Sequence, residues 1–383
     1  MTLPAPTRDD PAASKRGLLE WIAGGSRTRW LLCSFTLCVF LPWFFSCPWL
    51  RPQIPGRAEW DAYWADVVLR KVNHPGYDYT RDFSPEKNEA KRNFRLLVPV
   101  LAKWLGGSLT AVHAVRFALQ ALLIVCLLLA AERAAGDRLA ALGVALAVAG
   151  THVGTEVWRD AFYWFDNCAH AFIALALVVA SPLAAATAML LGLFVDERVL
   201  CALPLVILFH SVIHRRAALF VALGLVVPVY FAIRFTLGAI YGMHHPVAGI
   251  GAAAILLPNL PMAPAAFWFA LEGGWLLVIA TRRTGAKKIE LACLVLFTVA
   301  ALAAAGLVQD FTRSATYAFP ATLVALALAA RGERAAENPV RLRRLAGWAA
   351  AVSLVVPNAM ILGDQVAFES SLPVRAVKMW LRP

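Results

Sequence analysis

Residues 168–216 read "CAHAFIALALVVASPLAAATAMLLGLFVDERVLCALPLVILFHSVIHRR", and how this stretch crosses a bilayer decides the topology of the chain. Its first part, 168–195, would be about 42 Å long as one helix, at about 1.5 Å per residue. That exceeds a hydrocarbon core of about 30 Å but falls short of two full crossings. Ser181-Pro182 interrupts the stretch near its middle, because proline breaks the helical hydrogen-bond ladder. It is therefore either one tilted helix or a hairpin of two short helices.

The distribution of basic residues favours the hairpin. The N-terminal residues Lys15, Arg16, Arg27 and Arg29 indicate a cytoplasmic tail. With a hairpin, the basic connections 214–216, 281–288 and 331–344 also face the cytoplasm, whereas a single helix would turn all three outward. We therefore predict about eleven spans, with the N-terminus inside and the C-terminus outside. An alternative keeps one long helix and lets 248–262 cross, but three prolines disfavour it.

The composition is that of a multi-pass membrane protein. Of 383 residues, 60% are hydrophobic and 16% are charged, and the mean hydropathy is +0.65. Soluble domains carry about 45–50% apolar and about 25% charged residues. We expect an all-α transmembrane bundle over 30–361, with amphipathic helices in an outer loop at 51–107, between tails at 1–29 and 362–383. The remaining predicted spans are 30–50, 108–131, 138–153, 217–236, 263–281, 289–308, 315–330 and 345–361.

Charge and cysteine content exclude two functional classes. The net charge of +12 would suit nucleic acid, but the basic residues lie beside apolar runs, as membrane anchors do. Most of the seven cysteines fall inside apolar runs, and neither a CxxC pair nor a Cys/His cluster is present. Nucleic-acid binding and a structural zinc site are therefore not expected. The first 30 residues also lack the order of a signal peptide.

Two acids follow the first predicted span in "RAEWDAYWADVV", 57–68. On a helix Glu59 and Asp61 diverge by about 200°, so that one faces a cleft while the other faces water. The neighbouring aromatic residues suit the headgroup level of a membrane. We predict that Asp61 or Glu59 acts as a general base on a substrate hydroxyl. The alternative is an amphipathic surface helix with solvated acids.

Basic residues at three places are candidate ligands of a lipid phosphate. Arg95 lies in "RNFRLLVPVLAKWLGG", 92–107, a short apolar helix typical of the membrane interface. Arg198 lies in "FVDERVL" and Arg313 in "QDFTRSATYAFP", where charges sit at the ends of apolar runs. Arginine suits phosphate because it donates two hydrogen bonds at once. The alternatives are snorkelling for Arg95 and ion pairs within the protein for Arg198 and Arg313.

Other polar residues on the outer side are assigned supporting roles. Arg313 and Asp310 are able to pair with each other or to face Arg198 and Asp196 across the bundle. Two histidines in a Gly/Pro-rich loop are candidate acceptor contacts, although such a pair is more often simply exposed. The supporting residues are Asp196, Glu197, Asp310, His244 and His245.

The stretch "THVGTEVWRDAFYWFDNCAH", 151–170, suggests a metal site. His152, Glu156 and Asp160 recur every four residues, which places them on one helical face, and Asp166 and His170 repeat the spacing. Carboxylates and imidazoles in this pattern suit a divalent cation such as Mg²⁺ or Mn²⁺. The alternative is a hydrogen-bonded helix at the membrane edge with interfacial aromatic residues.

The layout of acids, amphipathic segment and charged turns resembles the GT-C superfamily of polytopic glycosyltransferases, in particular its poorly characterised bacterial members. The residues that carry the likeness are "EWDAYW", "FRLLVPVLAKWL", "FVDERVL" and "QDFTRSATYAFP". The resemblance implies a multi-pass protein of the bacterial inner membrane that moves a sugar from a polyprenyl-phosphate donor to a glycan or lipid acceptor. It also implies that Asp61 or Glu59 is the base and that Arg198 or Arg313 holds the lipid phosphate.

Three other functions remain open at this point. A transporter or flippase would need ionisable residues deep in the spans or an inverted repeat, and no convincing repeat is present. A non-catalytic assembly protein of polysaccharide export would need no catalytic carboxylate. A membrane metal hydrolase would use the residues of 151–170 and would lose activity to chelators.

Overall fold

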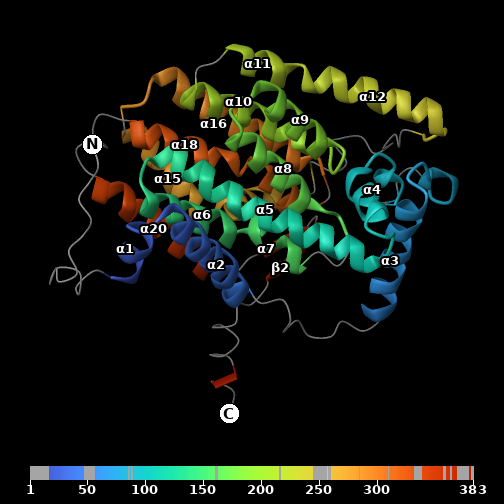
Figure 1. Cartoon of the computed structure of the whole chain (residues 1–383), viewed down its shortest axis with the longest axis horizontal. Helices are drawn as coiled ribbons and strands as arrows, with labels where there is room; N and C mark the ends of the chain where they lie inside the picture. The colour runs from blue at the N-terminus through green and yellow to red at the C-terminus, as the bar shows by residue number, and fades with distance from the viewer. Residues whose placement is uncertain are drawn as a thin grey trace.

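The computed structural model describes a helical protein with one short β-hairpin (Figure 1). The described residues are 17–46, 57–84, 87, 89–159, 163–214, 217–244, 257, 260–283, 285–308, 310–331, 339–356, 359–362, 365–368 and 379–380. The first helices are α1 (Leu18–Ala23), α2 (Arg27–Ser46), α3 (Arg57–Asn73), α4 (Leu97–Trp104), α5 (Leu109–Ala135), α6 (Arg138–Gly150), α7 (His152–Arg159), α8 (Asp166–Val178), α9 (Pro182–Leu193) and α10 (Val199–Ile213). They are followed by α11 (Ala217–Gly224), α12 (Val226–Tyr241), α14 (Ala263–Leu271), α15 (Gly274–Ala280), α16 (Lys288–Gly306), α17 (Phe311–Ala315), α18 (Pro320–Arg331) and α20 (Pro339–Val355). Strands β1 (Ala359–Leu362) and β2 (Gln365–Phe368) pair antiparallel, with Ala359 opposite Phe368.

The stretch 168–195 folds as two short helices, as the charge pattern predicts. Helix α8 ends at Val178, and α9 begins at Pro182. The Ser181 hydroxyl accepts a hydrogen bond from the backbone N–H of Ala184, which caps α9, and proline occupies the first helical position. The single tilted helix is therefore excluded.

The predicted count of eleven spans is wrong. Within the described part of the chain, four helical segments are long and apolar enough to cross a membrane: Arg27–Phe45, Leu109–Ala135, Ala217–Tyr241 and Lys288–Gly306. The number rises to six if each of two helix pairs, bent by 55° and 91°, counts as one span. A span needs about 20 residues, whereas α8, α9 and α10 have 13, 12 and 15. These helices identify a helical membrane protein, with fewer full-length spans than predicted.

The last two predicted spans differ most from their predicted bounds. The region predicted as 315–330 is interrupted, because α17 is followed by a 3-10 turn at Thr316–Ala318 before α18 begins at Pro320. The region predicted as 345–361 is helical only to Val355, and β1 begins at Ala359. Hydropathy alone does not register these breaks, since the apolar composition continues through them.

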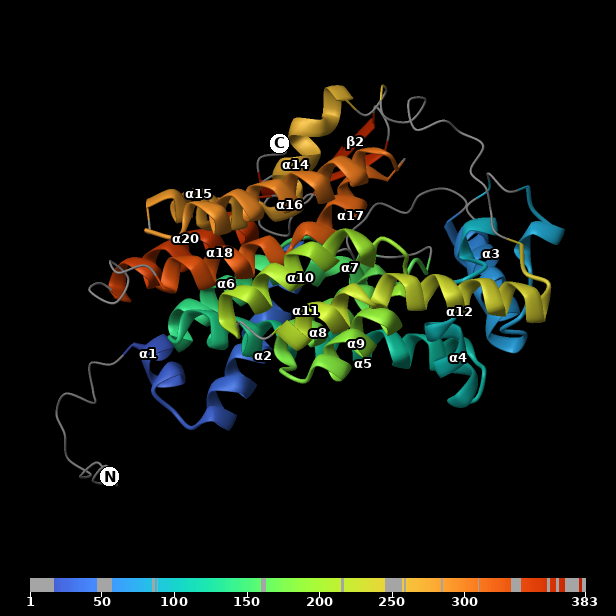
Figure 2. The same ribbon diagram turned by 90° about the horizontal axis from the view of Figure 1, so that it is seen from above.

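The two ends of the molecule carry different elements. Helices α3 and α4 lie at one end of the long axis, and α1 lies toward the opposite end (Figures 1 and 2). Near α1, Glu132 pairs with Arg27 and Arg138, and Arg343 forms a two-pronged ion pair with Asp137. Basic residues thus gather where α5 ends and α6 and α20 begin.

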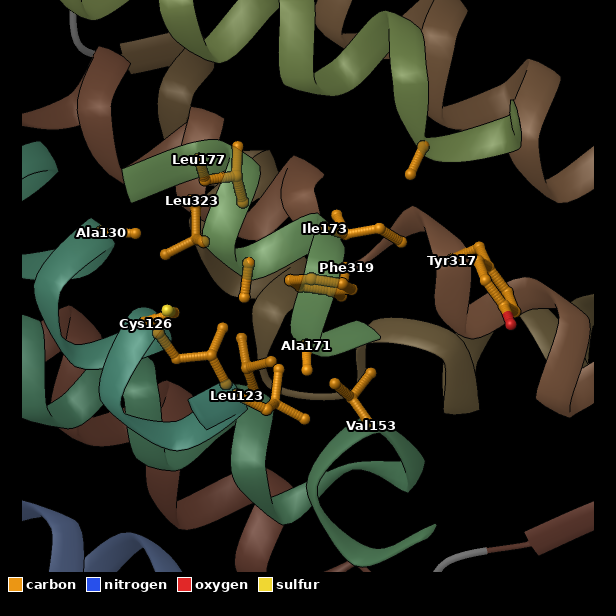
Figure 3. Packing of buried hydrophobic residues seen from close by; sticks show 14 of the residues in the cluster. Leu123, Cys126, Ala130, Val153, Ala171, Ile173, Leu177, Tyr317, Phe319 and Leu323 are labelled. Carbon is orange, nitrogen blue, oxygen red and sulfur yellow. The ribbon is translucent and has the colours of Figure 1, made fainter. Parts of the chain in front are cut away.

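Small residues allow close helix packing in the centre of the bundle. A Cβ atom added to Gly143 or Gly150 of α6 would come within 2.9 Å of Ala346 or Ser353 of α20. Such close approach is typical of helix pairs in membranes. Elsewhere in the core, side chains of α5, α8 and α18 interdigitate, and Tyr317 lies at the edge of this group with its hydroxyl turned away from it (Figure 3).

Candidate functional site

Six charged side chains form a continuous series of ion pairs in which the sign of the charge alternates. The shortest N–O distances between successive members are 2.9, 2.7, 2.6, 2.5 and 3.1 Å. In order, the members of this charge chain are Arg95, Asp196, Arg198, Asp166, Arg313 and Asp310. Three positive and three negative charges alternate in this buried series, and the more exposed Glu197 lies 4.0 Å from Arg95 at its end. Balanced pairing is what permits burial, because an unpaired ion inside a protein is strongly destabilising.

Four separate segments supply the charge chain. Asp196 and Arg198 lie in the turn between α9 and α10, Asp166 begins α8, and Arg313 lies on α17. The turn is also fastened to the outer loop, because the carbonyl of Phe194 accepts hydrogen bonds from the N–H groups of Leu96 and Leu97 at 2.8 and 3.1 Å. This backbone contact fixes the segment before α4 beside the turn and brings Arg95 to Asp196.

Arg198 and Arg313 are engaged within the protein. The Arg198 guanidinium donates to both carboxylate oxygens of Asp196, to Asp166 and to the hydroxyl of Ser314. Arg313 pairs with Asp166 and Asp310. Burial raises the pKa of Asp196, but Arg198 and Arg95 outweigh that effect and hold the pKa well below its usual value. The structure therefore places these two arginines in the intraprotein ion pairs that were the alternative to phosphate binding.

A cavity lies at the end of the charge chain where Arg95 is found. It is small and partly open to solvent: its empty space, open solvent included, is about 240 Å³, and it has room for about one water molecule. The lining residues are Val68, Lys71, Tyr79, Arg92, Arg95, Pro99, Tyr163 and Phe165. Three of them are cationic, two present tyrosine rings, and none is an acid. The cationic side chains of this lining suit an anionic group.

Two tryptophans stack on the arginines beside the cavity. The Trp164 ring lies 4.3 Å from the guanidinium carbon of Arg92 and 4.6 Å from that of Arg313. Arg92 also lies 4.5 Å from the ring of Trp64 on α3, and the two tryptophan rings are 6.0 Å apart. Because cation–π contacts restrain the planar guanidinium, these rings hold Arg92 in place.

The two candidate bases on α3 lie on different faces of the helix. Asp61 shares a face with Trp64, Val68 and Lys71, at spacings of three or four residues, and this face is buried from Trp64 onward. Asp61 itself is half-buried, whereas Glu59 is exposed. The cavity is lined by Val68 and Lys71. Asp61 shares their face of α3 but is not part of the lining, because it lies seven residues before Val68, about 10 Å along the helix axis.

The predicted supporting residues are only partly brought together. Glu197 lies 4.0 Å from Arg95. His244 pairs through Nδ1 with Asp78 Oδ2 at 2.7 Å, and its carbonyl accepts from Asn93 at 2.9 Å. These contacts fasten the chain just after α12 to the outer loop. His245 lies outside the described residues.

The predicted metal site is not assembled from those of its members that the structure describes. His152 pairs with Glu156, Asp166 is held by two arginines, and His170 Nε2 lies 3.2 Å from the hydroxyl of Thr316. Among the described residues, no group of three or more His, Cys, Asp or Glu side chains is placed to hold a metal ion. Asp160 is not among them. Asp166 instead forms ion pairs with Arg198 and Arg313.

Sequence reasoning did not single out Lys71 or Tyr79. Lys71 follows Trp64 by seven residues and therefore falls on the apolar face of the predicted helix. A lysine on the buried face of an amphipathic helix is unusual. This position is the feature of the sequence from which a role for Lys71 could have been predicted. Tyr79 follows a loop and carries no periodicity that would reveal its place in the cavity.

Comparison of the sequence with protein-family models gives no match, and neither do comparisons with curated proteins and with solved structures. The function is therefore inferred from the charge chain, the cavity and the α3 face.

Proposed function

We propose that the protein is a membrane-embedded glycosyltransferase that moves a sugar from a polyprenyl-phosphate donor to an envelope acceptor. The observation that carries the proposal is the cavity, which joins three cationic side chains to apolar and aromatic walls and has no acid among the lining residues that the structure describes. A lipid-linked sugar phosphate has these features in one molecule: a charged phosphate, a sugar ring and an apolar chain.

In this proposal Arg95 and Arg92 stabilise the phosphate. Arg95 is held by Asp196 on one side and lines the cavity on the other. Arg92 is restrained between two tryptophan rings. Transfer breaks the bond between the sugar and the phosphate oxygen, so negative charge grows on the phosphate as the sugar leaves. Fixed guanidinium groups stabilise that charge without having to reorganise.

Asp61 is the proposed general base. It lies on the α3 face that reaches the cavity, whereas Glu59 lies on the exposed face. As the acceptor oxygen bonds to the sugar carbon, the Asp61 carboxylate takes the hydroxyl proton. Of the two candidate bases that the sequence offers, the proposal therefore keeps Asp61 and leaves out Glu59.

The location and the family remain part of the proposal. The layout that resembles the GT-C superfamily implies the bacterial inner membrane, with the N-terminus in the cytoplasm and the cavity on the outer side. The basic residues around the end of α5, at the opposite end from α3 and α4, support that orientation.

A transporter is the second candidate, because the charge chain lies buried among the helices. Carboxylate and guanidinium side chains like those of the charge chain are typical of residues that line transport pathways in membrane proteins. The transport hypothesis predicts that Asp166 and Arg198 control movement of a substrate and that Asp61 does not matter.

An assay of sugar transfer distinguishes the two candidates. Membranes that contain the full chain are incubated with radiolabelled polyprenyl-phosphate sugars, and label in an acceptor fraction is counted. Asp61→Asn should abolish transfer, and the matched variant Glu59→Gln should retain it, with equal amounts of each protein in the membrane. Full transfer by the Asp61→Asn variant would remove the proposed base, and absence of transfer by the wild-type chain with every donor would contradict the proposed activity.

A further inference from the structure

Lys71 is a buried cation that faces the cavity. Its residue is 2% exposed, and it lines the cavity together with Tyr79, Arg92 and Arg95. The ammonium donates a hydrogen bond to the carbonyl oxygen of Tyr77 at 2.6 Å and lies 3.5 Å from the sulfur of Met243. Both contacts are to uncharged groups.

Within the described part of the chain, no carboxylate forms an ion pair with Lys71. The acid that acts on it most strongly is Asp78, and the oxygens of this carboxylate are already occupied. Asp78 Oδ1 accepts hydrogen bonds from Thr80 and from Asn93, and Oδ2 accepts from His244. Asp78 is thus committed to holding the outer loop against the end of α12.

An ammonium buried without a counter-ion is strongly destabilised relative to water. Burial lowers the pKa of Lys71 to about 7, although the charge of Asp78 acts in the opposite direction. The arginines that share the cavity add no compensating negative charge. The charged form of Lys71 therefore lacks a counter-ion in the cavity, and an entering anion would supply one.

We infer that Lys71 anchors the phosphate of the ligand, and that its ammonium gains an ion-pair partner only when this phosphate is bound. The inference rests on the proposed phosphate site but not on the transfer of a sugar. It gives Lys71 a role distinct from that of Arg95, whose guanidinium is already paired with Asp196.

Binding of the phosphate should change the protonation of Lys71. A phosphomonoester is a dianion above its second pKa of about 6, and an ion pair favours the charged form of lysine. Above pH 7 the neutral amine must therefore bind a proton when the phosphate binds. Arg92 and Arg95 are the other cations that face Lys71. Tyr77 and Tyr79 do not take up or release a proton in this range, because the pKa of each is raised above its ordinary value near 10. The pKa of Asp78, which is lowered to about 2, lies far below this range. His244 is paired with that carboxylate.

The test is calorimetric titration of the detergent-solubilised full chain with farnesyl monophosphate at pH 8. The titration is repeated in two buffers of different ionisation enthalpy, which gives the number of protons taken up. The variants are Lys71→Met and Lys71→Arg. Lys103→Met is the matched control, because Lys103 is exposed and donates to the carbonyl of Asn73.

The wild-type chain should bind the probe with uptake of close to one proton. Lys71→Met should bind at least about tenfold more weakly and without uptake, and Lys71→Arg should bind without uptake because arginine stays charged. Lys103→Met should behave as the wild type. Without ligand, the thermal unfolding midpoint of Lys71→Met should be no lower than that of the wild type, because the substitution removes a buried charge that has no counter-ion. If Lys71 had a purely structural role, the substitution would lower the midpoint.

Two results would overturn the inference in distinguishable ways. If the wild type and Lys71→Met bound the probe equally well, or if proton uptake persisted in Lys71→Arg, Lys71 would not be a ligand of the phosphate. The phosphate site itself would remain supported. If the wild-type chain did not bind the probe, both the phosphate site and the role of Lys71 would be contradicted.

Discussion

Arg95 and Asp196 join the cavity to the buried charge chain, since Arg95 Nη2 lies 2.9 Å from Asp196 Oδ2 while Arg95 also lines the cavity. Asp196 is fully buried and accepts three hydrogen bonds from Arg198, two from the guanidinium and one from the backbone N–H. The orientation of one cavity-lining cation therefore depends on ion pairs that lie outside the cavity.

Asp196→Asn should weaken donor binding by releasing Arg95. Loss of one partner of a buried ion pair costs about 2–5 kcal/mol, so KM for the donor should rise by at least about tenfold while kcat changes less. The same substitution in an Arg95→Gln background should add little, because both changes remove the same interaction. Additive effects of the two substitutions would show that Asp196 does not act through Arg95. Asp66→Asn, in an exposed ion pair with Arg70, is the matched control.

Asp166→Asn should destabilise the fold. Asp166 is fully buried and bridges Arg198 and Arg313 at 2.6 and 2.5 Å, so its loss leaves two guanidiniums without their shared counter-ion. The free energy of unfolding should fall by about 3–5 kcal/mol, measured by denaturant titration in detergent. Asp137→Asn, which removes an exposed ion pair with Arg343, should cost about 0–1 kcal/mol. Equal losses in the two variants would contradict the central structural role of Asp166.

Trp164→Leu should loosen the arginines beside the cavity. The ring stacks on Arg92, Arg95 and Arg313, and cation–π contacts contribute about 0.5–2 kcal/mol each. Donor affinity should therefore fall by about tenfold, with partial recovery in Trp164→Phe, as measured by titration with farnesyl monophosphate. Trp348→Leu, at an exposed position of α20, should leave affinity unchanged. A Trp164→Phe variant no better than Trp164→Leu would argue against stacking.

The contact between the outer loop and the end of α12 should weaken in acid. Burial raises the pKa of Asp78, but hydrogen bonds from His244, Thr80 and Asn93 together lower it from 3.8 to about 2. A carboxylate with a lowered pKa stabilises the fold above its ordinary pKa, and this contribution is lost as the pH falls from about 4 through about 2. The stability difference between wild type and Asp78→Asn should therefore shrink over that window in thermal unfolding. If the stability difference between the wild type and Asp78→Asn stayed constant down to pH 2, the role of the ionised Asp78 would be contradicted. The Asp66→Asn variant is the control, because it measures how acid affects stability when an exposed carboxylate is removed.

The helical membrane class could be read from the sequence, because long apolar runs dominate the composition. The break at Ser181-Pro182 was also predictable, since proline both ends one helix and begins the next. The number of full-length spans was not. Helices α8, α9 and α10 are as apolar as true spans but are short, and residue content does not reveal where a helix bends or stops inside an apolar run.

The site was predictable in its parts but not in its pairing. The sequence indicated Arg95, Asp196, Arg198, Asp310 and Arg313 as unusual charges beside apolar runs. It did not indicate that Asp166 bridges Arg198 and Arg313, because a bridge across 32 and 147 residues depends on tertiary packing. Because of these ion pairs, Asp166 is occupied by arginines and not by the predicted metal ion, and Arg198 and Arg313 are occupied by carboxylates and not by the predicted phosphate.

The central claim is that a phosphate-bearing lipid occupies the cavity between the outer loop and the charge chain. The most direct measurement is photo-crosslinking of the full chain with a diazirine-bearing farnesyl phosphate, followed by mass spectrometry of the labelled peptides. We predict adducts on residues 64–79 and 92–104 that disappear when unlabelled farnesyl phosphate is added in excess. Adducts confined to other segments, or labelling that excess farnesyl phosphate does not reduce, would contradict the claim.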